Sequence, residues 1–368
     1  MSIESDLKKE GIEIVSKFDT LKVNTIAKNI AQKLVRAFPE YNFKLGELFI
    51  RLSKLNMYQV KVTKGNAQAS YHYKNTSIYF NEKTPFSKIT DYALHECIHY
   101  LQERKDKQGH LIRLGLCDLT QFKLHGLGMN EAAVQLATAK AFEGKEEQVT
   151  YYGITFPTTS PTYYPLECNL ISQMAYFTGE YALFDSTFHS NNSFKDKFVA
   201  LTDERTFYAL EKTFDSILDC EDNLDKLETM LEQEDNVSHS QRIKKKIEEE
   251  KKRIANIYFE AQNLMLTRYF TKQFDLISNL EEVENYRRKL YQYKNRIGTT
   301  DSYHFFNDFY LKMMQKLEAK YLQLENGEYD DIKQDLAITK TSQWTRIIRI
   351  IKKILFGSSE EYKKIDDK

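Results

Sequence analysis

The position of its prolines limits what the second half of this chain can fold into. The sequence has 368 residues and five prolines, and all five prolines precede Leu166. From Leu166 to Lys368 there are also only four glycines. Because proline and glycine are the residues that interrupt helices, this half is predicted to be almost wholly helical. The first half, which holds the prolines, is predicted to mix helices and strands.

Two kinds of periodicity occur in the first half. Apolar residues recur with a helical period from Val23 to Phe38, which predicts a helix that ends before Pro39. Short runs rich in aromatic and β-branched residues then follow, separated by polar segments. They predict a small antiparallel meander with strands at Met57–Thr63, Ala69–Tyr73 and Ser77–Phe80.

Two further helices are predicted after these strands. Thr84 and Pro85 are typical of an N-cap and a first helical position, and they predict a helix that runs to about Arg104. A second helix is expected from about residue 129 to residue 142. Residues 145–165 are rich in Thr, Tyr and Pro, which predicts a long ordered loop that covers a cleft.

The expected fold class is α+β, mostly α, in three parts. Residues 1–195 are predicted to form the mixed domain, and residues 196–330 a helical, coiled-coil region with a long helical hairpin that turns near residues 235–240. Residues 331–368 are predicted to form an amphipathic basic helix and a disordered tail. The charges of the hairpin favour a solvated surface, with a coiled-coil partner or homodimer as the alternative.

The strongest chemical signal is the sequence His95-Glu96-Cys97-Ile98-His99. On a helix the two histidines lie one turn apart on the same face, where both can bind one Zn²⁺. Glu96 is offset by about 100° around the helix, so it borders the metal and can take a proton from water. Leu94, Ile98 and Leu101 form the apolar side of the same helix.

A catalytic zinc site needs a third protein ligand. The best candidate is Glu131, because it lies on the next predicted helix, where several alanines permit a close approach of the two helices. Glu167 is the rival for this role. Charge stabilisation at the start of a helix is the alternative explanation for either glutamate.

These residues resemble the gluzincin class of zinc metallopeptidases, over about residues 70–145. The resemblance implies a zincin-like metallopeptidase core with a small sheet packed over the H-E-x-x-H helix. It also implies one Zn²⁺ per chain, held by His95, His99 and Glu131, with Glu96 as the general base. Thermolysin-like gluzincins place an aspartate four residues after the ligand glutamate, and this chain has Gln135 there. A glutamine oxygen can still accept the N–H of a ligand histidine.

The residue that stabilises the oxyanion of the reaction is expected in the tyrosine-rich loop. Tyr163 and Tyr164 are favoured, because a loop after the third-ligand helix could close over a bound peptide. The other residues considered for this role are His110, His125, Tyr151 and Tyr152.

Composition excludes several other classes of function. The 53 Lys and Arg residues balance the 53 Asp and Glu residues, so the overall basic charge of a nucleic-acid-binding protein is missing and no nucleic-acid partner is expected. The four cysteines form no C-x-x-C pair, which excludes a zinc ribbon. Without a secretory signal or an apolar run of about 18 residues, the chain is expected to be cytoplasmic.

The segment 341–357 adds a membrane-related expectation. Its isoleucines fall on one helical face and its Arg and Lys residues on the flanks, which is typical of a helix at a membrane surface. Docking of these isoleucines onto the body is the alternative. The first reading would place the protein at the inner face of the membrane as a peripheral protein.

Taken together, these patterns predict a zinc-dependent peptidase that hydrolyses a peptide or protein substrate. A non-catalytic zincin-like protein that binds a partner or a membrane surface is the alternative. The presence of Glu96 favours the enzyme, because a structural metal site needs no general base.

Overall fold

The computed structural model describes residues 7–9, 11–63, 67–85, 88–120 and 123–332. Within these ranges helices predominate and the strands form three small sheets, which confirms the α+β, mostly helical class. The segment 341–357 and the predicted tail lie outside the described residues. None of the described helices combines the length and the hydropathy that crossing a membrane requires.

The first sheet has the strand order β1-β2-β4-β3 and is mixed. Its outer strands pair antiparallel with their neighbours, but β2 and β4 are parallel, with Met57 opposite Ile78. The predicted antiparallel meander is therefore wrong in its pairing. The five residues of β4 are all buried, which suits a central strand, whereas β3 is half-buried at the edge. The strands are β1 (Ile12–Lys17), β2 (Asn56–Val62), β3 (Ala69–His72) and β4 (Ser77–Asn81).

Helix α4 (Ile89–Gln102) packs against β3 and β4 of this sheet, and α2 (Thr20–Ala37) packs on α4. The helix predicted from Val23 is confirmed as α2, and the Asp19 side chain caps it by accepting the Lys22 N–H at 2.8 Å. The cap predicted at Thr84 is wrong: α4 begins at Ile89, and the Thr84 hydroxyl bonds to Gln68 instead. The helices are α2 (Thr20–Ala37), the 3₁₀ turn η1 (Pro39–Tyr41), α3 (Leu45–Leu52), α4 (Ile89–Gln102) and α5 (Leu127–Ala141).

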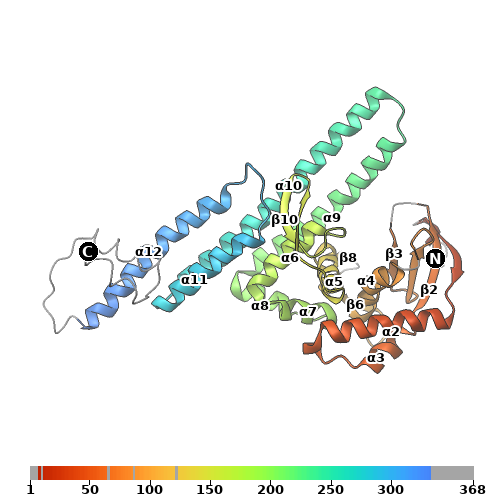
Figure 1. Cartoon of the computed structure of the whole chain (residues 1–368), viewed down its shortest axis with the longest axis horizontal. Helices are drawn as coiled ribbons and strands as arrows, with labels where there is room; N and C mark the ends of the chain where they lie inside the picture. The colour runs from red at the N-terminus through yellow and green to blue at the C-terminus, as the bar shows by residue number, and fades with distance from the viewer. Residues whose placement is uncertain (1–6, 10, 64–66, 86–87, 121–122, 333–368) are drawn as a thin grey trace, which may run out of the picture.

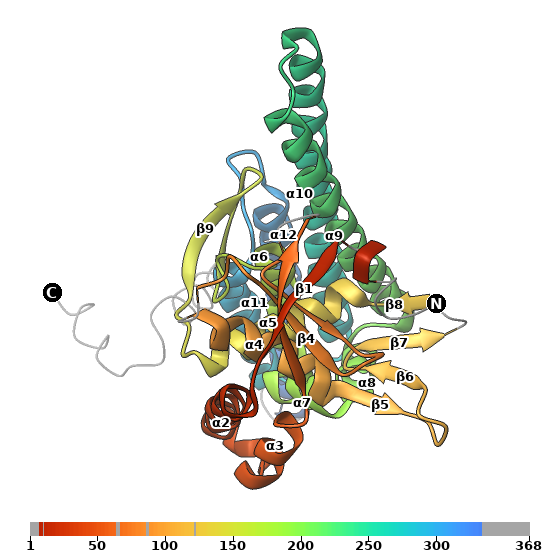
Figure 2. The same cartoon turned by 90° about the vertical axis from the view of Figure 1, so that its right-hand side faces the viewer.

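Two small antiparallel sheets complete the first half (Figure 2). Four short strands connect α4 to α5, in a segment for which the sequence predicted no helix or strand. Residues 145–165, predicted as a loop, instead form a β-hairpin followed by an irregular segment at 159–164. The strands are β5 (Glu103–Lys105), β6 (Leu111–Leu114), β7 (Cys117–Thr120), β8 (Lys123–His125), β9 (Glu147–Tyr151) and β10 (Ile154–Thr158).

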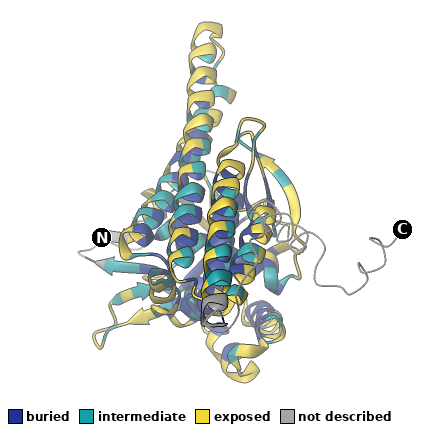
Figure 3. Cartoon of the chain, turned by 90° about the vertical axis from the view of Figure 1, so that its left-hand side faces the viewer, coloured by how far each residue is buried: buried dark blue, intermediate teal, exposed yellow. Residues whose placement is uncertain are grey.

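The second half is helical as far as it is described, as the lack of proline predicts. Figure 1 shows α9 and α10 side by side as a hairpin that projects from the body, and Figure 3 shows its distal part exposed. The turn between Glu232 and Val237 lies close to the predicted one. The elements are α6 (Pro165–Thr178), α7 (Glu180–His189), α8 (Ser193–Leu201), α9 (Glu204–Glu232), α10 (Val237–Asp275), α11 (Leu280–Tyr293), the 3₁₀ turn η3 (Lys294–Arg296) and α12 (Phe305–Ile332).

The base of this hairpin positions α5. Asp215 on α9 accepts the backbone N–H groups of Gly126 and Gly128 at 3.1 and 2.9 Å, where its negative charge also suits the positive end of the helix. A Cβ atom at Gly128 would lie only 2.5 Å from the carbonyl oxygen of Phe214, so the close approach requires glycine. The end of α5 that carries Glu131 is therefore fixed by α9.

Candidate metal centre

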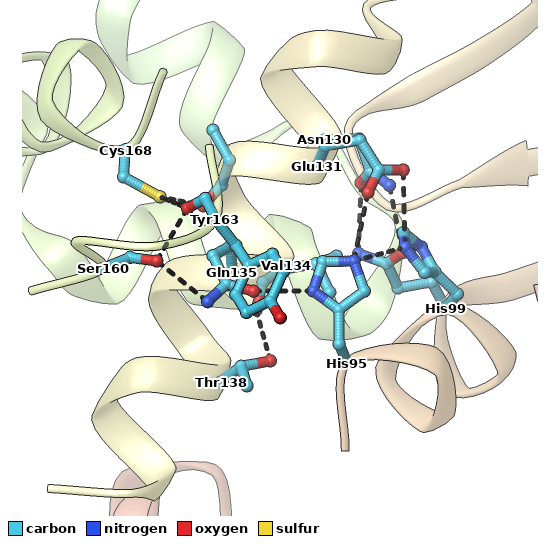
Figure 4. Close-up of polar contacts among 12 residues, drawn as sticks. His95, His99, Asn130, Glu131, Val134, Gln135, Thr138, Ser160, Tyr163 and Cys168 are labelled. Atoms are coloured by element: carbon cyan, nitrogen blue, oxygen red, sulfur yellow. Dashed lines mark hydrogen bonds and ion pairs between the residues drawn. The ribbon is translucent and has the colours of Figure 1, made fainter. Parts of the chain in front are cut away.

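The three predicted metal ligands converge between α4 and α5 (Figure 4). The Nε2 atoms of His95 and His99 lie 3.1 Å from each other, and they lie 3.1 and 3.4 Å from the two carboxylate oxygens of Glu131. All candidate ligand atoms lie within 4.8 Å of one another. Two nitrogens and a carboxylate at this spacing form a group that could hold a metal ion. The donor set is one that borderline metals such as zinc accept.

The charges of this group shift the pKa values of Glu131 and His99 in opposite directions. The two imidazoles outweigh the effect of burial and hold the pKa of Glu131 below its usual range. Burial alone would lower the pKa of His99, but the Glu131 carboxylate raises it to about 9. In the metal-free protein, a proton on His99 therefore compensates the carboxylate. A metal ion would replace that proton at the same place.

A chain of hydrogen bonds orients the ring of His95. The Ser160 hydroxyl donates to the Tyr163 carbonyl at 2.7 Å, so its oxygen is left to accept from the Gln135 amide nitrogen at 2.9 Å. The Gln135 oxygen then faces His95 Nδ1 at 2.9 Å. This arrangement places a proton on Nδ1 and leaves Nε2 to face Glu131. Gln135 thus accepts the N–H of a predicted ligand histidine, as expected from its position four residues after Glu131.

Glu96 lies beside the three ligands. It lines a cavity of about 470 Å³ together with His95, and the backbone N–H of Tyr71 on β3 bonds to its carboxyl group. Burial raises the pKa of Glu96, although the two histidines partly oppose this shift. A raised pKa makes a carboxylate a stronger base, which suits a group that accepts a proton.

The two favoured tyrosines both line this cavity, in different positions. The ring of Tyr164 lies 6.1 Å from the ring of His95, between centroids. The negative charge of Glu131 and burial hold the pKa of Tyr164 well above its usual range, so its hydroxyl stays protonated. Tyr163 is 39% exposed at the mouth, and its hydroxyl donates to Tyr92 at 2.9 Å. Of the two, Tyr164 lies closer to the predicted ligands.

The remaining candidates lie apart from the ligand group. Glu167 is fully buried on α6 beside Glu221, and it is not part of the group that could hold a metal. The hydroxyls of Tyr151 and Tyr152 bond to Pro161 and Glu221, respectively. Two histidines complete this set: His110 pairs with Asp106 in an exposed turn, and His125 lies exposed on β8.

The sequence reading missed four residues that support the site: Tyr71, Gln102, Asn130 and Ser160. Asn130 directly precedes the predicted ligand Glu131 in the chain. Gln102 lies at i+3 from His99, a spacing that could have marked it as a neighbour on the same helix face. No comparable sequence signal points to Tyr71 or Ser160, because both come from other elements.

Comparison with known proteins adds no family. No protein-family model, no curated protein and no solved structure matches this chain. The assignment of a function therefore depends on the geometry and chemistry of this site.

Proposed function

We propose that this protein is a zinc-dependent peptidase of the gluzincin type. One observation carries the proposal: His95, His99 and Glu131 converge on one point, and Glu96 lies next to them on the wall of a cavity. A buried structural site would need neither the cavity nor the adjacent base. A sheet beside the H-E-x-x-H helix and a second helix carrying the third ligand also support a zincin-like core.

In this proposal His95, His99 and Glu131 hold one Zn²⁺ per chain. When bound, zinc would lower the pKa of a coordinated water to about 7 and polarise the carbonyl of the substrate. The hydrogen bond from His95 to Gln135 keeps the lone pair of Nε2 directed at the site. The Glu131 carboxylate completes a His₂Glu set, the composition of a catalytic site with one open position.

In this proposal Glu96 transfers the proton, and Tyr164 stabilises the negative charge that develops on the substrate. The Glu96 carboxylate accepts the proton of the attacking water and gives it to the leaving amine, and the Tyr71 N–H holds it in place. The protonated hydroxyl of Tyr164 donates to the oxyanion that develops on the substrate. Tyr163, at the mouth of the cavity, contacts the peptide or protein substrate.

Metal analysis tests the first half of this proposal. Protein purified without added metal is analysed by mass spectrometry, together with His99→Ala and Glu131→Ala. We expect about one zinc per chain in the natural protein and none in either variant. If the natural protein binds no zinc even after reconstitution, the proposal fails.

Cleavage of a quenched peptide library tests the second half. Zinc-loaded protein should cleave, and Glu96→Gln should keep its zinc while losing at least about a hundredfold in kcat. Tyr164→Phe should lower kcat by roughly ten- to a hundredfold with little change in KM. A Glu96→Gln variant with unchanged activity would show that a contaminating peptidase was measured.

A further inference from the structure

The proposed function assigns no role to the small sheet β5–β8, yet one of its turns reaches the metal centre. The turn between β6 and β7 contains Gly115 and Leu116. The backbone N–H of Leu116 donates to the side-chain oxygen of Asn130 at 3.0 Å. Asn130 is fully buried and precedes the ligand Glu131 in the chain. This contact links the sheet to the start of α5.

The contact with Leu116 decides how the Asn130 amide is oriented. A backbone N–H can only donate, so the atom that faces it must be the oxygen of Asn130. That oxygen also accepts from the amide nitrogen of Gln102 at 3.1 Å, and the nitrogen of Asn130 donates to the oxygen of Gln102 at 3.3 Å. The two buried amides therefore form a reciprocal pair with one allowed orientation.

The orientation of Gln102 in turn decides the state of His99. The Gln102 oxygen faces His99 Nδ1 at 3.3 Å, and an amide oxygen can only accept. One proton of the His99 ring is therefore held on Nδ1. Nε2, which faces His95 and Glu131, is the nitrogen that would exchange its proton for a metal ion. Three hydrogen bonds in series thus run from the backbone N–H of Leu116 to the ring of His99. They determine that Nδ1 of this ring carries a proton.

The turn fits closely over the amide pair. Gly115 has φ +58°, and a Cβ atom there would lie 2.2 Å from both the Asn130 oxygen and the Gln102 nitrogen. The Gly115 N–H donates at 2.7 Å to the Ser190 hydroxyl, which donates to the Gln102 carbonyl at the end of α4. The backbone is thus held on both sides of the pair, and any side chain at position 115 would displace the amides.

We infer that the β6–β7 turn is a positioning element for the metal centre, which fixes the tautomer of His99 through Asn130 and Gln102. The inference rests on the proposed metal site and adds to it three positioning residues, Gly115, Asn130 and Gln102. None of them touches the substrate or the metal. They act through the ring of His99, by keeping its Nε2 lone pair free for the metal.

We call the series of hydrogen bonds from Leu116 through Asn130 and Gln102 to His99 the relay. The chemical nature of the groups that accept from the histidines also affects how tightly the site would bind zinc. Both histidines donate to neutral amide oxygens, Gln102 and Gln135, instead of to carboxylates. A carboxylate partner would raise the basicity of the ring and tighten the bond to the metal. Gln102→Glu keeps an acceptor for His99 Nδ1, although it loses the N–H that Asn130 accepts. It is therefore expected to bind zinc more tightly than Gln102→Leu, which has no acceptor.

Two glycine variants separate the relay from simple strain. Gly115→Ala and Gly109→Ala both place alanine at a positive φ, +58° and +85°, in neighbouring turns of the same sheet. At Gly109 a Cβ atom would meet nothing within 4 Å. Chelator competition should show a ten- to hundredfold higher zinc dissociation constant for Gly115→Ala and an unchanged one for Gly109→Ala.

NMR supplies a readout that does not depend on zinc or activity. Long-range ¹H–¹⁵N spectra of ¹⁵N-histidine protein should show an Nδ1 proton of His99 that is protected from exchange. The proton should remain in Gly109→Ala and in Gln102→Glu, and it should be lost in Gly115→Ala and Gln102→Leu. The Nδ1 proton of His95, which belongs to the Gln135 chain, should remain in all four variants.

The outcomes distinguish this inference from the proposed function. Equal zinc affinities and equal Nδ1 protection in the two glycine variants would overturn the positioning role. If Gly115→Ala does not fold, Gln102→Leu and Gln102→Glu decide, and equal affinity in these two would overturn it as well. If the natural protein binds no zinc while His99 loses its protected proton only in Gly115→Ala and Gln102→Leu, the proposed function fails and the relay stands.

Discussion

Glu131 and Glu167 lie in buried surroundings on α5 and α6, yet the two carboxyl groups are in opposite states. Glu131 faces two imidazole nitrogens, and its pKa is lowered. Both oxygens of Glu167 lack a hydrogen-bond partner, and burial together with the negative charge of Glu221 raises its pKa well above the usual range. Burial is common to both, so the neighbouring groups make the difference.

The comparison shows why one glutamate suits a metal and the other does not. A metal ligand must be ionised, and the imidazoles of His95 and His99 keep Glu131 ionised before any metal arrives. Burial and the negative charge of Glu221 favour the protonated form of Glu167. Glu221 also accepts a hydrogen bond from Tyr152. Glu167 is thus held in its protonated form, which does not bind a metal ion.

The largest expected effect is on metal affinity. Glu131→Gln removes the charged ligand, so the zinc dissociation constant should rise by more than about a hundredfold, the upper range for loss of a supporting residue alone. Glu167→Gln should change it less than about threefold, because this group lies outside the ligand set. Competition with a chelator of known affinity measures both. Comparable losses in the two variants would remove the distinction between the glutamates.

A smaller effect is expected on the stability of the metal-free protein. The pKa of His99 is about 9, above its usual value of 6.5, so the ion pair with Glu131 stabilises the fold fully below pH 6.5. That stabilisation is lost as the pH rises through about 9, where the folded protein releases the proton. We expect a loss of about 3 kcal/mol in the free energy of unfolding, measured by urea denaturation with chelator present.

His99→Gln provides the control for this pH dependence. It should lack the decline between pH 6.5 and 9, because glutamine does not titrate. Identical pH profiles for the natural protein and this variant would mean that His99 does not hold the proton.

The smallest expected effect concerns Glu167 itself. Its raised pKa means that the folded state keeps a proton that the unfolded chain loses above pH 4.5, so its destabilising effect grows as the pH rises. Glu167→Gln should therefore raise the free energy of unfolding at pH 8 by about 1 kcal/mol and leave it unchanged at pH 4.5. Glu260→Gln, an exposed position on α10, should have no effect at either pH. A destabilised Glu167→Gln variant would show that the carboxyl group has a partner it needs.

Long helices with a clear apolar periodicity could be predicted from the sequence. Very short strands, and the pairing of strands that are distant in sequence, could not. The helix at Val23 and the helical second half follow from apolar periodicity and the absence of proline. The strands β5–β8 have three or four residues each, too few to show an alternation. The parallel pairing of β2 with β4 was not predicted. It places β4 in the interior of the sheet and β3 at its edge, and this strand order depends on which strands are buried in the folded protein.

The same limit applies to the candidate site. The spacing of His95 and His99 reveals two ligands on one helix face, and the small residues around Glu131 indicate a helix that can approach closely. The residues that orient the ligands come from other elements. Ser160 belongs to the segment after β10, and Leu116 contributes only its backbone N–H. A backbone donor has no side-chain signature, so no sequence pattern could have revealed it.

The length of α10 affects how this protein will behave in solution. Its 39 residues span about 58 Å at 1.5 Å per residue, whereas a compact protein of 368 residues has a radius of gyration of about 21 Å. An elongated particle diffuses more slowly than a sphere of equal mass. A monomer of 43.4 kDa will therefore elute earlier from a gel-filtration column than a compact protein of the same mass, so light scattering is the measurement to use when its mass in solution is determined.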